Sequence, residues 1–149
     1  MQRAAIYLRI SQDRTGLHAG VQRQQEDCLA LADQLGFTES RVFIDNDVSA
    51  FDGGRRPGYD ALVAGIRSGV SRIIVWHVDR LYRQPKELED LIALVERHPV
   101  RIDAVRGGGF DLNTAEGRLM ARQLVAIAAY ESGHKSDRVK RANKRLGRV

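Results

Sequence analysis

The chain has 149 residues, of which 43% are hydrophobic and 29% are charged, and this composition indicates one globular domain. No apolar run approaches the roughly 20 residues of a membrane span, and the N-terminus lacks the layout of a signal peptide. The lone Cys28 cannot form an internal disulfide. These features exclude a membrane-spanning or disulfide-rich protein and favour a cytoplasmic location.

The net charge of +5 is unevenly distributed. Residues 135–149 contain seven basic side chains against one acidic one, a net charge of +6 that leaves −1 for residues 1–134. A localised cationic stretch is the electrostatic signature of nucleic-acid binding. A solvated basic tail remains an equally open interpretation of the charge alone.

The first half of the chain predicts two strands around one helix. Residues 4–11 alternate apolar and polar side chains, which is typical of a strand. Residues 12–20 are expected to form a loop, residues 21–35 a helix closed by Gly36, and residues 41–45 a second strand. The stretch that follows, up to Gly58, is rich in Asp and Gly and predicts a loop.

The second half continues the alternation of helices and strands. Pro57 is expected to open a helix that ends near Gly69. Residues 72–78 are typical of a buried parallel strand, residues 86–97 of an amphipathic helix, and residues 100–105 of a further strand.

A long helix is expected to follow the glycines at 107–109. Thr114 is its predicted N-cap, and about 30 residues of helix would extend about 45 Å, farther than a small domain needs. Its first half is apolar and its second half basic. The whole pattern predicts an α/β domain with a mainly parallel central sheet and a long C-terminal helix.

Polar residues at the ends of the first and third predicted strands are candidate site residues. Arg9 and Ser11 share one face of the first strand, at the sheet edge where ligands bind. Asp79, Arg80 and Arg83 follow the buried strand, and two guanidinium groups three residues apart suit a phosphate. The alternatives are an exposed serine beside a solvated arginine, and a surface ion-pair network.

The ordered motifs Tyr-x-Arg-x-Ser, Arg-Pro-Gly and Asp-Arg-Leu-x-Arg, with a Gln on the first helix, resemble the catalytic domain of the serine recombinases (resolvases and invertases). The resemblance covers residues 3–145, and residues 23–28 look more like the large serine integrases. It implies a three-layer resolvase-like fold. It also implies a catalytic core at residues 1–114 and a helix at residues 115–149 for oligomerisation and DNA contact.

The resemblance also implies roles for individual residues. Ser11 would be the nucleophile, and three arginines would hold the scissile phosphate: Arg9, Arg80 and Arg83. Asp79 would position these arginines, while Gln24 and Arg56 would complete the site. DNA contacts on the long helix are expected from Arg138, Lys140, Arg141, Lys144 and Arg145.

The implied activity is site-specific recombination of double-stranded DNA through a 5′-phosphoserine intermediate, with no cofactor or metal. Homodimers would associate into homotetramers during strand exchange. The chain would be a fragment of a longer recombinase from a bacterium or mobile element. Two alternatives stay open: a non-catalytic DNA-binding or assembly module, and a metal-dependent nuclease that uses Asp45, Asp47 and Asp52, residues expected instead to make turns.

Overall fold

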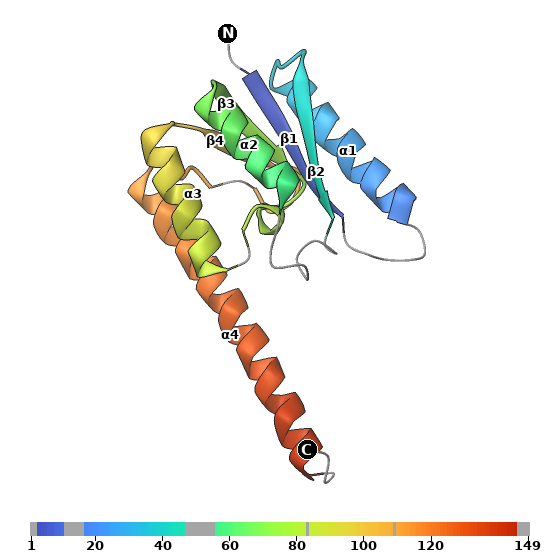
Figure 1. The fold of residues 1–149 in the computed structure, drawn as a ribbon, viewed down its shortest axis with the longest axis vertical. Helices are drawn as coiled ribbons and strands as arrows, with labels where there is room; N and C mark the ends of the chain where they lie inside the picture. Colours follow the sequence, from blue (N-terminus) through green and yellow to red (C-terminus); the bar gives the residue numbers. More distant parts are fainter. Residues whose placement is uncertain (1–2, 11–16, 47–55, 83, 109, 146–149) are drawn as a thin grey trace.

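The computed structural model describes residues 3–10, 17–46, 56–82, 84–108 and 110–145. Four strands alternate with helices along the chain (Figure 1). The elements are β1 (Arg3–Ile10), α1 (Leu17–Gln34), β2 (Ser40–Asn46), α2 (Pro57–Arg67), β3 (Val70–Val75), the 3₁₀ turn η2 (Val78–Arg80), α3 (Pro85–Arg97), β4 (Arg101–Ala104) and α4 (Ala115–Arg145).

The four strands form one parallel sheet in the order β2-β1-β3-β4. The chain moves outward from β1 to β2, then crosses back to β3 on the other side of β1 and continues to β4. The sheet therefore has a topological switch point between β1 and β3, and in open α/β sheets ligands bind at the carboxyl ends of the strands there. This architecture confirms the predicted α/β fold with a parallel sheet.

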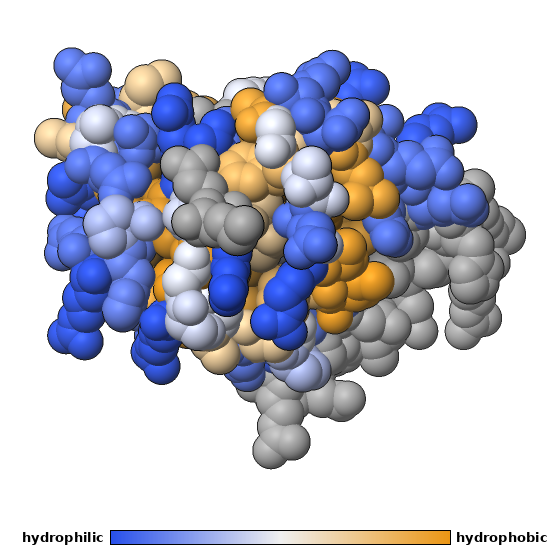
Figure 2. Space-filling view, turned by 90° about the horizontal axis from the view of Figure 1, so that it is seen from above, coloured by the Kyte–Doolittle hydropathy of each residue, from blue (hydrophilic) through white to orange (hydrophobic). Residues whose placement is uncertain are grey.

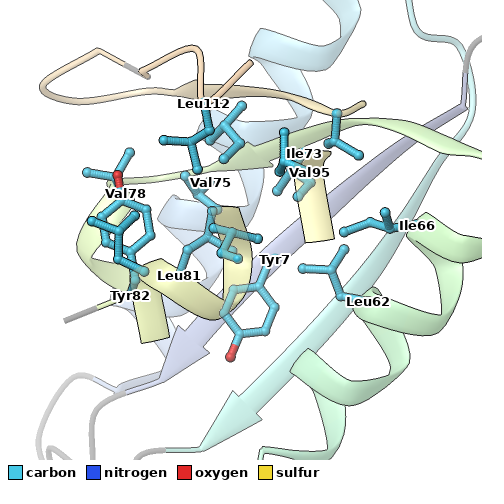
Figure 3. Packing of buried hydrophobic residues seen from close by; sticks show 14 of the residues in the cluster. Tyr7, Leu62, Ile66, Ile73, Val75, Val78, Leu81, Tyr82, Val95 and Leu112 are labelled. Carbon is cyan, nitrogen blue, oxygen red and sulfur yellow. The ribbon is translucent and has the colours of Figure 1, made fainter. Parts of the chain in front are cut away.

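Helices cover both faces of the sheet and give three layers. The side chains of β1 alternate between the layers: Ile6 and Leu8 pack with Cys28 of α1, whereas Tyr7 lies on the opposite face. That second face holds the larger cluster, to which α2, α3 and η2 contribute (Figure 3). The Tyr7 ring lies within this cluster, and its hydroxyl points toward the carboxyl ends of β1 and β2.

The last helix begins at Ala115 and follows a capping residue, as predicted. The Thr114 hydroxyl accepts a hydrogen bond from the Gly117 N–H at 3.0 Å. The helix packs on α3 through a narrow buried face at Ala121 and Val125, and its remaining turns extend past the carboxyl edge of the sheet, clear of the core (Figure 1). Seen from the top of Figure 1, the surface is mostly hydrophilic, with smaller apolar areas between the charged side chains (Figure 2).

Two predicted boundaries were wrong. The loop predicted to reach residue 20 is shorter, because α1 already begins at Leu17. Gly20 suggested a break, but a single glycine inside a helix costs only about 1 kcal/mol relative to alanine. The strand predicted for residues 72–78 ends at Val75, and Val78 then begins η2. Val78 is apolar because it is buried in the core cluster, and apolar runs do not distinguish a strand from a buried turn.

Within the described ranges, no helix combines the length and the apolar character that crossing a membrane requires.

Candidate active site

The candidate site lies at the carboxyl edge of the sheet, around the switch point. Arg9 is 8% exposed near the end of β1 and is aligned with Asp45 of β2 across the ladder. The turn η2 follows β3 and contacts β1, so it brings Asp79 and Arg80 beside the end of β1. The sequence therefore predicted correctly that Arg9, after the first strand, and Asp79 and Arg80, after the third, lie at one edge of the sheet.

Asp45 ties three elements together at this edge. Its carboxylate is buried and accepts hydrogen bonds from the Tyr7 hydroxyl at 2.6 Å and from the backbone N–H groups of Gly58 at 2.7 Å and Tyr59 at 2.8 Å. Both N–H groups belong to the first turn of α2, so Asp45 caps that helix from a neighbouring strand. The prediction that Asp45 makes a turn was wrong, because a turn preference ignores partners distant in sequence. Asp47 and Asp52 lie outside the described residues.

The proline and glycine of the Arg-Pro-Gly motif each have a structural role at the start of α2. Pro57 is the first residue of α2, where its missing N–H costs nothing. A side chain at Gly58 would bring its Cβ within 2.5 Å of the Ile44 carbonyl oxygen, so only glycine permits the close approach of α2 to β2. The close approach is what lets Asp45 reach the helix N-terminus.

Arg56 directs its guanidinium into the protein. It donates to the Tyr7 hydroxyl at 2.9 Å, to the Arg80 carbonyl at 3.1 Å, to the Leu81 carbonyl at 3.2 Å and to Glu87 of α3 at 2.8 Å. Its side chain is 11% exposed. In this structure Arg56 thus holds the backbone of η2, and with it the start of the Arg80 side chain, against β1 and α3.

Tyr7 and Tyr59 supply the apolar walls around this guanidinium. The Arg56 guanidinium carbon lies 4.2 Å from the centre of the Tyr59 ring and 5.4 Å from that of Tyr7, within the range of cation–π attraction. Burial raises the pKa of Tyr59 to about 12. Burial, helped by the hydrogen bond to Asp45, also raises the pKa of Tyr7 far above its ordinary value, so its hydroxyl stays neutral and holds both Asp45 and Arg56.

Arg80 is held differently. Its Nε lies 3.7 Å from an Asp79 carboxylate oxygen, too far for a hydrogen bond, and this shielded nitrogen donates to no other residue in the part of the chain that the structure describes. Its guanidinium lies 5.9 Å from the centre of the Trp76 ring. Asp79 also lies 3.1 Å from His77 Nδ1, which accepts the Asp79 backbone N–H. The switch point therefore carries a buried donor that has no acceptor among the described residues, and buried donors normally have one.

Comparison with known proteins identifies the fold and the family. The family model described as the resolvase N-terminal domain matches residues 4–148. The chain belongs to this family. It resembles the serine recombinase PinR of Escherichia coli K12 (28% identity) and the Tn2501 resolvase of Escherichia coli (29%), each over 76 residues that cover 51% of this chain.

The matched segment spans only 38–39% of the length of those two curated relatives. Among solved structures, the N-terminal catalytic domain of TP901-1 integrase has the same fold, with a TM-score of 0.61 and 22% identity over 90% of this chain and 99% of that one. This likeness agrees with the three-layer resolvase-like fold that the sequence predicts.

The structure brings together four of the predicted site residues of this resolvase-family domain: Arg9, Arg56, Asp79 and Arg80. Gln24 is half-buried on α1, which packs on the opposite face of the sheet from Tyr7, and no hydrogen bond joins it to the other described site residues. Ser11 and Arg83 lie outside the described residues. So do the side chains of the five predicted DNA-binding residues: Arg138, Lys140, Arg141, Lys144 and Arg145.

Sequence reasoning missed three residues of this edge. In the sequence, Tyr7 stands out only as part of the Tyr-x-Arg-x-Ser motif, and Glu87 and Trp76 only as members of a predicted helix and a predicted strand. Glu87 accepts hydrogen bonds from Arg56 and from the Gln84 N–H at the start of α3. The capping box that it forms there was the only feature of the sequence that could have pointed to Glu87. Tyr7 gave none, because a tyrosine in an alternating strand is typical of an ordinary core residue.

Proposed function

We propose that this domain is the catalytic part of a site-specific DNA recombinase in which Ser11 is the nucleophile. The observation that carries the proposal is the shielded Nε of Arg80 at the switch point, beside the strand that leads directly into Ser11. A phosphodiester oxygen is the acceptor that such a guanidinium suits best. Family membership and the ordered motifs support the same reaction.

In this reaction the Ser11 oxygen attacks the DNA phosphorus and loses its proton. The bond from phosphorus to the 3′ oxygen breaks, and that oxygen leaves as a hydroxyl after gaining a proton. A 5′-phosphoserine remains, and its ester bond retains the energy that rejoining requires, so no nucleotide cofactor is consumed. Negative charge grows on the non-bridging oxygens during attack, and arginines fixed in advance stabilise it.

The described residues divide this work. Arg80 offers its unused donor to the phosphate, and Arg9 lies at the end of the strand that precedes Ser11. Asp79, 50% exposed, limits the directions in which Arg80 can point. Arg56 acts here through another residue, because its donors hold the carbonyls of Arg80 and Leu81. Arg83 is proposed as a further phosphate contact and Gln24 as a supporting residue on the resemblance alone.

Duplex DNA as substrate and assembly of several copies are part of the proposal. Of the eight large apolar side chains exposed in the described part of the chain, five lie on α4: Leu119, Met120, Leu124, Ile127 and Tyr130. A groove of about 940 Å³ separates α4 from η2 and the start of α3, and its walls are mainly apolar. This surface suits a second copy, and the basic end of α4 suits the DNA backbone.

A suicide substrate tests the proposal. A nicked duplex that contains the element's recombination site, incubated with the full-length recombinase, should give a protein–DNA adduct that survives denaturation and EDTA. Mass spectrometry should place the phosphate on Ser11, and Ser11→Ala should abolish the adduct while leaving binding intact. Cleavage that EDTA abolishes and that leaves no adduct would support a nuclease instead. Binding without any cleavage would support a non-catalytic module.

A further inference from the structure

A fourth arginine, Arg106, lies at the same edge of the sheet as Arg9, Arg56 and Arg80. Arg106 follows β4, and its backbone N–H donates to the Trp76 carbonyl at 2.8 Å, which fixes it beside the end of β3. The next residue, Gly107, has a φ of +76°, and a Cβ there would lie 3.0 Å from His77 Nε2. Backbone hydrogen bonding and close packing therefore hold this turn against the residues that lead into η2.

Trp76 links Arg106 to Arg80. The Arg106 guanidinium carbon lies 5.6 Å from the centre of the Trp76 ring, and that of Arg80 lies 5.9 Å from the same centre. Cation–π attraction is strongest to tryptophan, and both guanidinium groups lie within its range of the half-buried Trp76 ring. Arg106 is exposed and forms no ion pair with another residue within the described ranges. Its charge is therefore available to a ligand.

We propose that Arg106 binds a DNA phosphate next to the one that Arg80 holds, with Trp76 keeping the two guanidinium groups at a fixed spacing. The inference rests on the proposed function, because it takes DNA as the substrate of this edge. Phosphates of one strand follow one another every ~3.4 Å along the helix axis, so two cations on one ring reach neighbouring phosphates of that strand. Arg106 would thereby set the register of the DNA against the reacting phosphate.

The chain provides its own probe, because Trp76 is its single tryptophan. The Ser11→Ala protein is titrated with a short duplex at about 50 mM salt, a concentration at which phosphate contacts are strong. Trp76 fluorescence is read in parallel with the anisotropy of the same duplex carrying a label. The emission should change saturably, with the same midpoint as the anisotropy, since DNA seats against the tryptophan.

Substitution of Arg106 then separates this contact from the basic helix. Arg106→Gln should weaken binding roughly tenfold at this salt concentration and make the slope of log affinity against log salt shallower by about 0.9. Arg106→Lys should retain most of the slope, since it retains the charge. The matched control is Arg41→Gln: Arg41 is also exposed and lies 5.3 Å from the centre of the Phe43 ring, but near the start of β2, at the opposite edge of the sheet. It should behave as the parent protein.

The inference is overturned if Arg106→Gln and Arg41→Gln behave alike. It is also overturned if the duplex binds without altering Trp76 emission, or if no binding occurs at this salt concentration. These readouts use protein without the Ser11 hydroxyl and do not depend on cleavage. A failure here is therefore distinct from a failure of the proposed reaction, which the adduct experiment reports separately.

Discussion

At the carboxyl edge of the sheet, side chains from β1, β2, α3 and the start of α2 satisfy one another through Tyr7, Asp45, Arg56 and Glu87. Along α4, by contrast, contact with the rest of the domain is limited to a narrow face and to exposed ion pairs with α3, such as Arg122 with Glu89. One region is fixed by buried, charge-assisted hydrogen bonds, and the other by small apolar residues.

The difference shows which part of the domain forms its contacts within the single chain and which part exposes apolar side chains. The carboxyl edge is organised by the single chain, since nearly every polar group that the network uses finds its partner there. The Nε of Arg80 differs, because it is shielded from solvent and donates to no acceptor in the described part of the chain. The large apolar side chains of α4 are more than half exposed, so that helix presents a surface for another molecule.

The largest expected effect distinguishes the Arg80 guanidinium from the hydrogen-bond network around it. Arg80→Ala should lower the rate of adduct formation by a factor of about 10²–10³, because a preorganised donor to the developing charge is lost. The midpoint of urea unfolding should scarcely change, since Arg56 binds the Arg80 carbonyl, which alanine retains. Arg67→Ala is the control, an exposed arginine in the last turn of α2 at the other edge. Equal rates for the two variants would contradict a catalytic role for Arg80.

The next effect tests whether Asp45 is the centre of the network. Asp45→Ala should lower the free energy of unfolding by about 3 kcal/mol, because it leaves the Tyr7 hydroxyl and two N–H groups of α2 without their acceptor. Urea denaturation measures this loss. Asp60→Ala, an exposed carboxylate in the first turn of the same helix, should cost well below half as much. A similar loss in both variants would mean that helix charge, and not the network, stabilises this edge.

A smaller effect concerns pH and the buried aromatic side of the core. Burial raises the pKa of Tyr82 to about 12, from 10.0. Between pH 10 and pH 12 the Tyr82 hydroxyl ionises in the unfolded chain but stays protonated in the folded one. The contribution of Tyr82 to the free energy of unfolding is therefore full below pH 10 and falls as the pH rises. Tyr82→Phe should make this fall shallower by about 1.4 kcal/mol per pH unit. Urea unfolding from pH 9 to about 11.5 measures it; an unchanged slope would show that Tyr82 ionises in the folded state.

The smallest effect on folding should come from the apolar side chains of α4. Leu124→Ser with Ile127→Ser should shift the free energy of unfolding by no more than about 0.5 kcal/mol, since both side chains are more than half exposed. The same double variant should sediment as a monomer at concentrations where the parent self-associates. Ala121→Ser, on the buried face of α4, is the contrasting variant and should destabilise the fold. Unchanged association of the double variant would remove this surface from the proposed interface.

The sequence predicted the fold well where the signal is local. Alternation in residues 4–11 placed Tyr7 and Arg9 on one face of β1, and Gly36 ends its helix with a φ of +90°, as a C-cap should. Thr114 caps α4 as predicted. Each of these features depends on a few neighbouring residues, whose preferred conformations the core then reinforces.

Four of the predicted site residues lie at one edge of the sheet, but the sequence did not predict their contacts. The order of the motifs grouped Arg9, Arg56, Asp79 and Arg80, yet nothing in the sequence distinguishes the arginine with an unused donor from the one whose donors are spent on Tyr7, Arg80 and Glu87. That distinction depends on where carbonyl groups of η2 lie relative to α2.

What the sequence by itself determined is the alternation of strands and helices, the edge at which the polar motifs gather, and the basic character of the long helix. The tertiary structure alone decided that Asp45 caps α2, that Arg56 supports η2, and that Trp76 carries two arginines. The physical reason is that hydrophobic periodicity and turn preference act over a few residues, whereas the hydrogen bonds of Asp45 and Arg56 join residues 13 to 49 positions apart once the sheet has brought them together.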